Sequence, residues 1–264
     1  MQEVFAEAGY HAVAYGEDNR LDAGDEGFKE MFLKNRQELR DIGKRPDLLV
    51  FTRKAAQELE LGASINLLSL REQEPLVRRA LVGVEVRGSK FRGKVYRAFR
   101  EKQRGEGEDV SHIESITPKV EDLPLILKWV RKFQVPHLYC QVFMDQIFGL
   151  SFERLMRVLV VRSKTNARAL RGRQPVEGFS ARDLRDVRVT NPAHSNFKKT
   201  HFIPVTIGRQ LAEIVDWNAD RPTFEMRERS TRFGRLDAYV IPSNGKFKVD
   251  VQAVRDLVTE ATKA

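Results

Sequence analysis

The chain has 264 residues, enough for one large domain with a substantial core, and 41% hydrophobic with 31% charged residues is typical of a soluble globular protein. Its net charge of +9 at pH 7 favours a polyanionic partner, and nucleic acid fits better than an anionic membrane because no basic amphipathic helix stands out. The longest uncharged run, residues 133–144, is too short to span a membrane, and the N-terminus lacks the basic region and apolar stretch of a signal peptide. Cys140 is the only cysteine, so we expect no intrachain disulfide and a reducing cytoplasm.

The N-terminal part of the chain is acidic and leads into a predicted helix. The first 26 residues contain seven acids and one arginine, so the rest of the chain is more basic than the net charge suggests. Asp25 is expected to cap a helix that runs to about Ile42, and Gly43 is expected to end it. The predicted core-facing stripe of this helix consists of Phe28, Met31, Phe32 and Leu39.

Two short apolar strands follow, and each carries one acid. Residues 48–51 and 81–86 are rich in aliphatic and β-branched residues, which is typical of strands that are packed on both faces. Asp47 precedes the first strand directly, and Glu85 lies within the second. A buried carboxylate needs a compensating cation, which is either a divalent metal ion or an arginine beside it in the sequence. The residues alone leave these two interpretations about equally supported.

These strands carry a resemblance to a known family. The sequences RPDLLVF (45–51) and VEVRGSKF (84–91) resemble the signature of PD-(D/E)xK nucleases, and the surrounding residues resemble the AccI-like group of type II restriction endonucleases. The similarity extends over most of the chain and includes residues 14–18, 117–124 and 142–145. It implies a restriction-endonuclease-like α/β fold and Mg²⁺-dependent hydrolysis of double-stranded DNA.

The resemblance also implies roles for individual residues. Asp47, Glu85 and the backbone carbonyl of Val86 would hold one or two Mg²⁺ ions, which activate a water molecule and stabilise the leaving oxygen. Glu26, in the first turn of the predicted helix, is a candidate third metal ligand, and the alternative is that it only interacts favourably with the helix dipole. By family analogy, the enzyme would act as a homodimer on a palindromic site.

One position departs from the signature, which has a lysine where this chain has Arg87. Strand alternation places Arg87 on the same face as Glu85 and Lys90 on the other face. A bulge at Gly88 would turn Lys90 back toward Glu85. We therefore expect Lys90 to supply the catalytic ammonium group and Arg87 to steady the scissile phosphate, with the reverse assignment as the alternative.

The middle of the chain alternates predicted helices with a strand. Helices are expected at residues 54–61, 74–80, 121–132 and 152–161, and a strand is expected at residues 137–144. The order strand, helix, strand from Glu85 onward predicts a right-handed crossover between two parallel strands. This crossover would place the strand at 137–144 in the same sheet as the strand that carries Glu85.

The basic residues of the chain gather in segments that follow these elements. Residues 92–104 interleave basic and aromatic side chains, which suits a segment that faces DNA, and a solvated helix face is the alternative. Residues 162–235 are predicted to be the DNA-recognition segment. The candidate DNA-binding residues are Arg92, Lys94, Arg162, Lys164, Arg168, Arg171, Arg173, Lys198, Lys199, Arg229 and Arg232.

The C-terminal part is predicted to form a hairpin and a closing helix. Residues 236–241 and 246–249 flank Ser243, Asn244 and Gly245, which is a hairpin pattern. Asp250 is expected to cap a helix whose apolar face packs on the body or forms a dimer surface; that face consists of Val251, Val254, Leu257 and Val258.

Taken together, the sequence predicts a single nuclease domain, residues 1–264, with a central mixed β-sheet flanked by helices. Its expected cofactor is Mg²⁺ and its expected partner is double-stranded DNA. Two alternatives stay open: a PD-(D/E)xK repair nuclease or nickase, and a non-enzymatic DNA-binding protein, which would leave Asp47 and Glu85 unexplained. A phosphate-binding NTPase is disfavoured because the chain has no G-x-x-x-x-G-K-[ST] motif.

Overall fold

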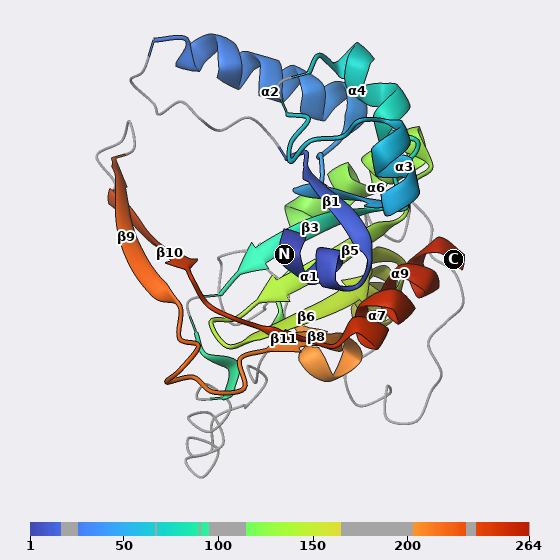
Figure 1. The fold of residues 1–264 in the computed structure, drawn as a ribbon. Coiled ribbons are helices and arrows are strands. Elements are labelled where there is room, and N and C mark those ends of the chain that lie inside the picture. The colour runs from blue at the N-terminus through green and yellow to red at the C-terminus, as the bar shows by residue number, and fades with distance from the viewer. Residues whose placement is uncertain are drawn as a thin grey trace.

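A seven-stranded mixed sheet with helices on both faces forms the body of the protein (Figure 1). The computed structural model describes the chain in seven ranges, which are residues 1–16, 26–66, 68–89, 91–94, 115–164, 203–230 and 236–263. The strand order is β1-β2-β3-β5-β6-β8-β11, and β9 with β10 and β4 with β7 form two small separate pairs. This architecture confirms the expected α/β fold with a central mixed sheet, and it is compatible with a restriction-endonuclease-like core.

The elements follow the chain in a largely alternating order. The strands are β1 (Tyr10–Ala14), β2 (Leu48–Thr52), β3 (Val82–Gly88), β4 (Ser115–Ile116), β5 (His137–Val142), β6 (Gln146–Ser151), β7 (Ile203–Pro204), β8 (Arg209–Glu213), β9 (Thr223–Ser230), β10 (Leu236–Ser243) and β11 (Lys248–Val249). The helices are α1 (Gln2–Glu7), α2 (Phe28–Ile42), α3 (Arg53–Glu58), α4 (Leu70–Val77), η2 (Val120–Asp122), α6 (Leu123–Phe133), α7 (Phe152–Lys164), η3 (Val205–Ile207) and α9 (Val251–Lys263). Among the described residues, no helix is long and apolar enough to cross a membrane.

The pairing of β3 determines where the candidate site lies. β3 is antiparallel to β2, with Leu48 opposite Val84, and parallel to β5, with Gly83 opposite His137. The parallel pair requires a crossover connection, and α6 lies on it, as the strand, helix, strand order predicts. Because β3 has neighbours on both sides, a side chain at its middle is enclosed by the sheet and by the helices above it.

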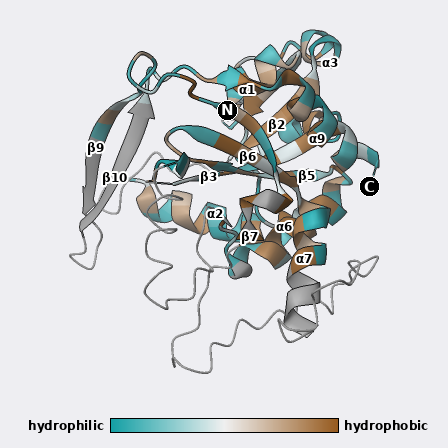
Figure 2. Ribbon diagram, turned by 90° about the horizontal axis from the view of Figure 1, so that it is seen from below, coloured by the Kyte–Doolittle hydropathy of each residue, from teal (hydrophilic) through white to brown (hydrophobic). Residues whose placement is uncertain are grey.

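Each face of the sheet has its own apolar layer. One face is covered by α1 and α9, where Val254, Leu257 and Val258 pack with strand residues. Asp250 caps α9, because its Oδ1 accepts a hydrogen bond of 2.9 Å from the amide of Ala253, so the predicted cap and buried face are confirmed. The opposite face is covered by α6 and α7, and Figure 2 shows hydrophobic residues gathered on these helices and on the sheet.

Helix α2 has the predicted length but not the predicted inner face. Its buried residues are Asn35, Glu38 and Ile42, whereas Phe32 is 47% exposed and stacks on Phe28 at the surface. The helix packs on α6 mainly near its C-terminal end, so the position of α6 decides which residues are covered. The structure therefore contradicts the predicted stripe at Phe32, whereas Phe28, Met31 and Leu39 are half-buried. Gly27 is at the N-cap position of the helix, and Asp25, the predicted cap, lies outside the described residues.

The two helices between the acidic strands are confirmed with shifted bounds. Helix α3 ends at Glu58, and α4 begins at Leu70, four residues before its predicted start. The earlier start has a local cause, because Ser69 and Glu72 form a capping box at the N-terminus of α4. Helix α4 also ends at Val77, so the predicted extension of the helix to residue 80 is wrong.

The predicted hairpin around Asn244 is also wrong. Strand β10 pairs over its full eight-residue length with the preceding strand β9, from Leu236 opposite Ser230 to Ser243 opposite Thr223. The two residues of β11 pair with β8 in the main sheet instead. The longer ladder supplies more backbone hydrogen bonds than a two-residue strand can offer, so β10 takes β9 as its partner.

Candidate active site

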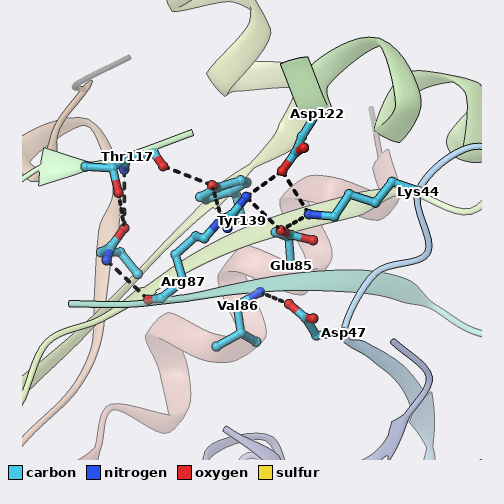
Figure 3. Close-up of polar contacts among 9 residues, drawn as sticks. Lys44, Asp47, Glu85, Val86, Arg87, Thr117, Asp122 and Tyr139 are labelled. Atoms are coloured by element: carbon cyan, nitrogen blue, oxygen red, sulfur yellow. Dashed lines mark hydrogen bonds and ion pairs between the residues drawn. The ribbon is translucent and has the colours of Figure 1, made fainter. Parts of the chain in front are cut away.

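The two acids that the sequence singles out lie beside each other on neighbouring strands. Strand β2 begins directly after Asp47, and its pairing with β3 places Leu48 opposite Val84. Asp47 Oδ2 accepts a hydrogen bond of 2.6 Å from the amide of Val86, the residue after Glu85 (Figure 3). The antiparallel pairing of two short strands thus brings together carboxylates that are far apart in the sequence.

The surroundings of Asp47 make its charge costly. Its backbone carbonyl accepts hydrogen bonds from the amides of Tyr15 and Gly16, at 2.9 and 3.1 Å, which fix the start of β2. Burial raises the pKa of the Asp47 carboxyl, although the Val86 amide and the positive charges of Lys44 and Arg87 act in the opposite direction. The negative charge of Asp47 is therefore only partly balanced by the groups around it.

Glu85 is almost completely buried, with 2% of its surface exposed. Its Oε1 contacts the ammonium group of Lys44 and lies 3.4 Å from Arg87 Nη2. Its buried Oε2 has no hydrogen-bond partner among the residues that the structure describes. Burial and then the negative charge of Asp47 raise the pKa of the Glu85 carboxyl. An unsatisfied, buried carboxylate oxygen next to a second carboxylate is an arrangement that a cation would stabilise.

Lys44 and Asp122 complete the cluster, and sequence reasoning missed both. Asp122 Oδ2 lies 2.9 Å from Lys44 Nζ and 2.5 Å from Arg87 Nη2, so one carboxylate oxygen holds both cations (Figure 3). Asp122 does fall in the segment 117–124 that carries the family resemblance, which was the only signal for it in the sequence. Lys44 is separated from Glu85 by 41 positions, and only the folded chain brings it to the site.

Arg87 shares the face of Glu85, as strand alternation predicts, and several contacts fix its side chain. Its Nε donates a hydrogen bond of 3.0 Å to Tyr139 Oη, and the Tyr139 hydroxyl in turn donates to the carbonyl of Thr117 at 3.1 Å. The backbone carbonyl of Arg87 accepts a bond of 3.2 Å from Gln141 Nε2. The guanidinium group is therefore held in place between Tyr139 and Asp122.

The bulge that would turn Lys90 toward the site is not found in the paired part of β3. The parallel pairing with β5 runs without interruption from Gly83 opposite His137 to Gly88 opposite Val142. The amide of Ser89 continues this pairing with a bond of 2.7 Å to the carbonyl of Val142. Gly88 is thus an ordinary strand residue, and Lys90 itself lies outside the described residues.

The structure does not bring Glu26 to the two acids. Glu26 lies in an exposed turn before α2, whereas the segment that carries Lys44 and Asp47 follows the other end of this helix. A helix of 15 residues is about 22 Å long at a rise of 1.5 Å per residue. The predicted metal role of Glu26 is therefore not supported by this geometry, and the third carboxylate of the cluster is Asp122.

The basic residues proposed to bind DNA are only partly described. Arg92 lies against the ring of Trp217, 3.9 Å from its centroid, and Lys94 Nζ lies 3.3 Å from Glu213 Oε2. Helix α7 contains Arg162 and Lys164, and β9 contains Arg229. The remaining candidates lie outside the described residues: Arg168, Arg171, Arg173, Lys198, Lys199 and Arg232.

The donor atoms at the site suit a magnesium ion. Mg²⁺ is commonly held by one or two carboxylates and keeps several water ligands, and Asp47 and Glu85 provide such a pair. Because the N–H and C=O of one strand residue point to the same side, the carbonyl of Val86 faces the side from which its amide binds Asp47. In the part of the chain that the structure describes, no group of three or more acidic, histidine or cysteine side chains is arranged to hold a metal. The fit therefore rests on two carboxylates and one carbonyl.

A mixed sheet flanked by helices, with two neighbouring acids on β2 and β3, is compatible with an α/β core of the restriction-endonuclease type. The sequence profile of the AccI restriction endonuclease family matches residues 4–113 and 94–170, which include Asp47, Glu85 and Asp122. The chain therefore belongs to the AccI restriction endonuclease family, and this membership makes it a nuclease that binds DNA. No curated protein and no solved structure matches the chain.

Proposed function

We propose that this protein is a type II restriction endonuclease, a single nuclease domain that cuts double-stranded DNA at a specific sequence in the cytoplasm with Mg²⁺ as cofactor. The observation that carries this proposal is the placement of Asp47 beside Glu85 on adjacent strands, where the buried Glu85 Oε2 has no hydrogen-bond partner in the described part of the chain. Family membership supports the reaction class, and the basic composition supports a polyanionic substrate.

Some residues of the site would bind the metal ion, and another would bind the phosphate. Asp47, Glu85 and the Val86 carbonyl would hold Mg²⁺, which supplies Lewis-acid chemistry by acidifying a water molecule and stabilising negative charge on the phosphate. Arg87 is held by Tyr139 and Asp122 and would steady the scissile phosphate. Its guanidinium group stays protonated, so it stabilises charge and cannot accept the proton of the attacking water.

The arrangement of the larger elements offers a direction from which DNA could approach. Figure 1 shows α2 and the β9–β10 ribbon projecting from the side of the molecule toward which β3 runs. The sequence of β9 contains Arg227 and Arg229, and arginine pairs well with phosphate and with guanine. We expect DNA to contact this side, where the C-terminal end of β3 carries Arg87.

The proposal is tested by incubating the protein with plasmid DNA and Mg²⁺ and sequencing the ends of the products. Discrete fragments with one common end sequence are expected. Nicked circles would instead support a repair nuclease or nickase, and unchanged plasmid that is nevertheless bound would support a non-enzymatic DNA-binding protein. In a control without Mg²⁺, cleavage should stop while DNA binding persists, which separates the cofactor requirement from DNA affinity.

Asp47→Asn and Glu85→Gln are expected to lower the cleavage rate by at least about a hundredfold, because each removes a negative charge needed to hold the metal. DNA binding without metal should persist in both variants, since the basic surface is unchanged. Glu58→Gln on the surface of α3 is a matched control and should cut normally. Full cleavage by either site variant would remove that residue from the metal site.

A further inference from the structure

The segment between α2 and β2 brings a lysine to the site from an unexpected part of the chain. The ammonium group of Lys44 contacts Glu85 Oε1 and lies 2.9 Å from Asp122 Oδ2. Its side chain is only 18% exposed, and Figure 3 shows it directed at Glu85. Within the described residues, these two contacts use two of the three donors of the ammonium group, which leaves one donor for a water or a phosphate oxygen.

The backbone around Lys44 is held so closely that this orientation is built into the fold. Gly43 has a φ of 82°, and a Cβ at this position would lie 2.2 Å from the carbonyl oxygen of Leu125 in α6. The amide of Lys44 donates a hydrogen bond of 3.1 Å to that same carbonyl. Only glycine allows this close approach, and it fixes the segment against α6, whose N-terminus follows Asp122.

The next residue is anchored independently. Arg45 Nη2 lies 2.9 Å from Glu38 Oε2 in α2, and Arg45 Nη1 donates to Gln73 Oε1 in α4 at 3.4 Å. The Arg45 side chain is only 4% exposed, so its charge is committed to this buried pair. With Gly43 against α6 and Arg45 between α2 and α4, the Lys44 side chain is directed toward β3.

We propose that Lys44 supplies the catalytic ammonium group, and that Asp122 is the positioning residue that holds the side chains of Lys44 and Arg87 beside Glu85. This inference rests on the proposed nuclease function and deepens it. Lysine suits the role because it offers a compact charge with movable donors, whereas the rigid fork of Arg87 suits a phosphate. The ammonium group of Lys44 contacts the carboxylates of Glu85 and Asp122, and this pairing favours a positive charge that can stabilise negative charge on the phosphate.

The test is single-turnover cleavage by Lys44→Met, with Lys54→Met on the exposed surface of α3 as the matched control. Cleavage by Lys44→Met should fall by about a hundredfold or more, the scale for a lost electrostatic stabiliser, while Lys54→Met cuts at the wild-type rate. Mg²⁺ binding, measured by calorimetry without DNA, should be as tight as in the wild type or tighter, because a positive charge beside Glu85 has been removed.

The outcomes separate this inference from the proposed function. A wild-type protein that cuts no DNA would overturn the nuclease proposal itself. Wild-type cleavage accompanied by normal cleavage in Lys44→Met would overturn only the role of Lys44, and a loss confined to Lys90→Ala would return that role to Lys90. Mg²⁺ binding weakened enough to explain the slower reaction would also overturn it, because Lys44 would then only maintain the metal site.

Two further variants keep the test decisive if Lys44→Met does not fold. Lys44→Arg keeps the charge but replaces the compact ammonium group, and its cleavage should fall at least about tenfold. Asp122→Asn should lower kcat with little change in the KM for DNA, since Asp122 acts through the two cations, and Asp122→Glu should restore part of the rate. Wild-type kcat in both Lys44→Arg and Asp122→Asn would reject the inference.

Discussion

Single residues at this site differ in how completely their charges are balanced. Glu85 and Asp122 contact the cations Lys44 and Arg87, whereas Asp47 binds only the amide of Val86 among its described side-chain contacts. Burial is the largest influence on Asp47 and raises its pKa. Asp47 therefore binds its proton more tightly in the folded, metal-free protein than in the unfolded chain, and this difference links stability to pH.

The stability of the metal-free protein should fall as pH rises through the range in which Asp47 ionises. A raised folded-state pKa means that the native state binds more protons than the unfolded state, so its contribution is fully present below the unfolded pKa and is lost as pH rises through the folded pKa. Asp47→Asn mimics the protonated form and removes this contribution. Relative to the wild type, the variant should therefore gain stability between pH 4 and pH 8, measured by urea unfolding in the presence of a chelator.

Saturating Mg²⁺ should reverse the comparison at pH 8. The ion binds the ionised carboxylates of the wild type and stabilises its native state by mass action, whereas Asp47→Asn has lost one ligand. A stability difference between the two proteins that does not change with pH would show that Asp47 has the same pKa in the folded and unfolded states. It would also remove the electrostatic argument for a cation at Asp47.

At the scale of elements, one buried ion pair joins α2 to the segment that carries both Lys44 and Asp47. Glu38 and Arg45 are each less than 10% exposed and lie 2.9 Å apart, and the Arg45 guanidinium also lies over the ring of Tyr15. Removing one partner from such a pair leaves an uncompensated buried charge, which is the costly case. The pair therefore controls the geometry of the site without touching it.

Arg45→Met should lower the free energy of unfolding by about 3–5 kcal/mol, because Glu38 would remain buried without its cation. Urea denaturation at pH 7 measures this change. The double variant Glu38→Leu with Arg45→Met should recover most of the loss, since both charges are then absent. Arg78→Met, which breaks the exposed pair with Glu74, is the surface control and should cost less than about 1 kcal/mol. Similar costs for the two single variants would contradict the anchoring role of Arg45.

Local patterns predicted the elements of the site better than its full composition. The apolar runs at β2 and β3, the capping Asp250 and the order of strand, helix and strand are all readable because each depends on neighbouring residues. Lys44 and Asp122 meet only because Gly43 packs against α6, a long-range contact that no spacing in the sequence encodes. The failed hairpin at Asn244 has a similar cause, since the choice of β9 over β11 depends on which ladder is longer.

At the scale of the whole molecule, one chain provides one pair of acids on β2 and β3 in the part that the structure describes. The two strands of a DNA duplex run in opposite directions, so one such site addresses one strand in a single binding event. A symmetric pair of chains would present two sites related by the same two-fold axis as a palindromic target. We propose that the protein acts as a homodimer, because this arrangement would let it cut both strands of one site.

The complex of the cleavage-deficient Asp47→Asn variant with a short palindromic duplex should contain two chains per duplex. Sedimentation equilibrium measures this ratio, with the target taken from the sequenced ends of wild-type products and a scrambled duplex of equal length as the control. With wild-type protein and supercoiled plasmid, nicked circles should not accumulate, because both strands are cut within one complex. A 1:1 complex, together with a nicked intermediate whose decay depends on protein concentration, would show instead that single chains cut the two strands in separate encounters.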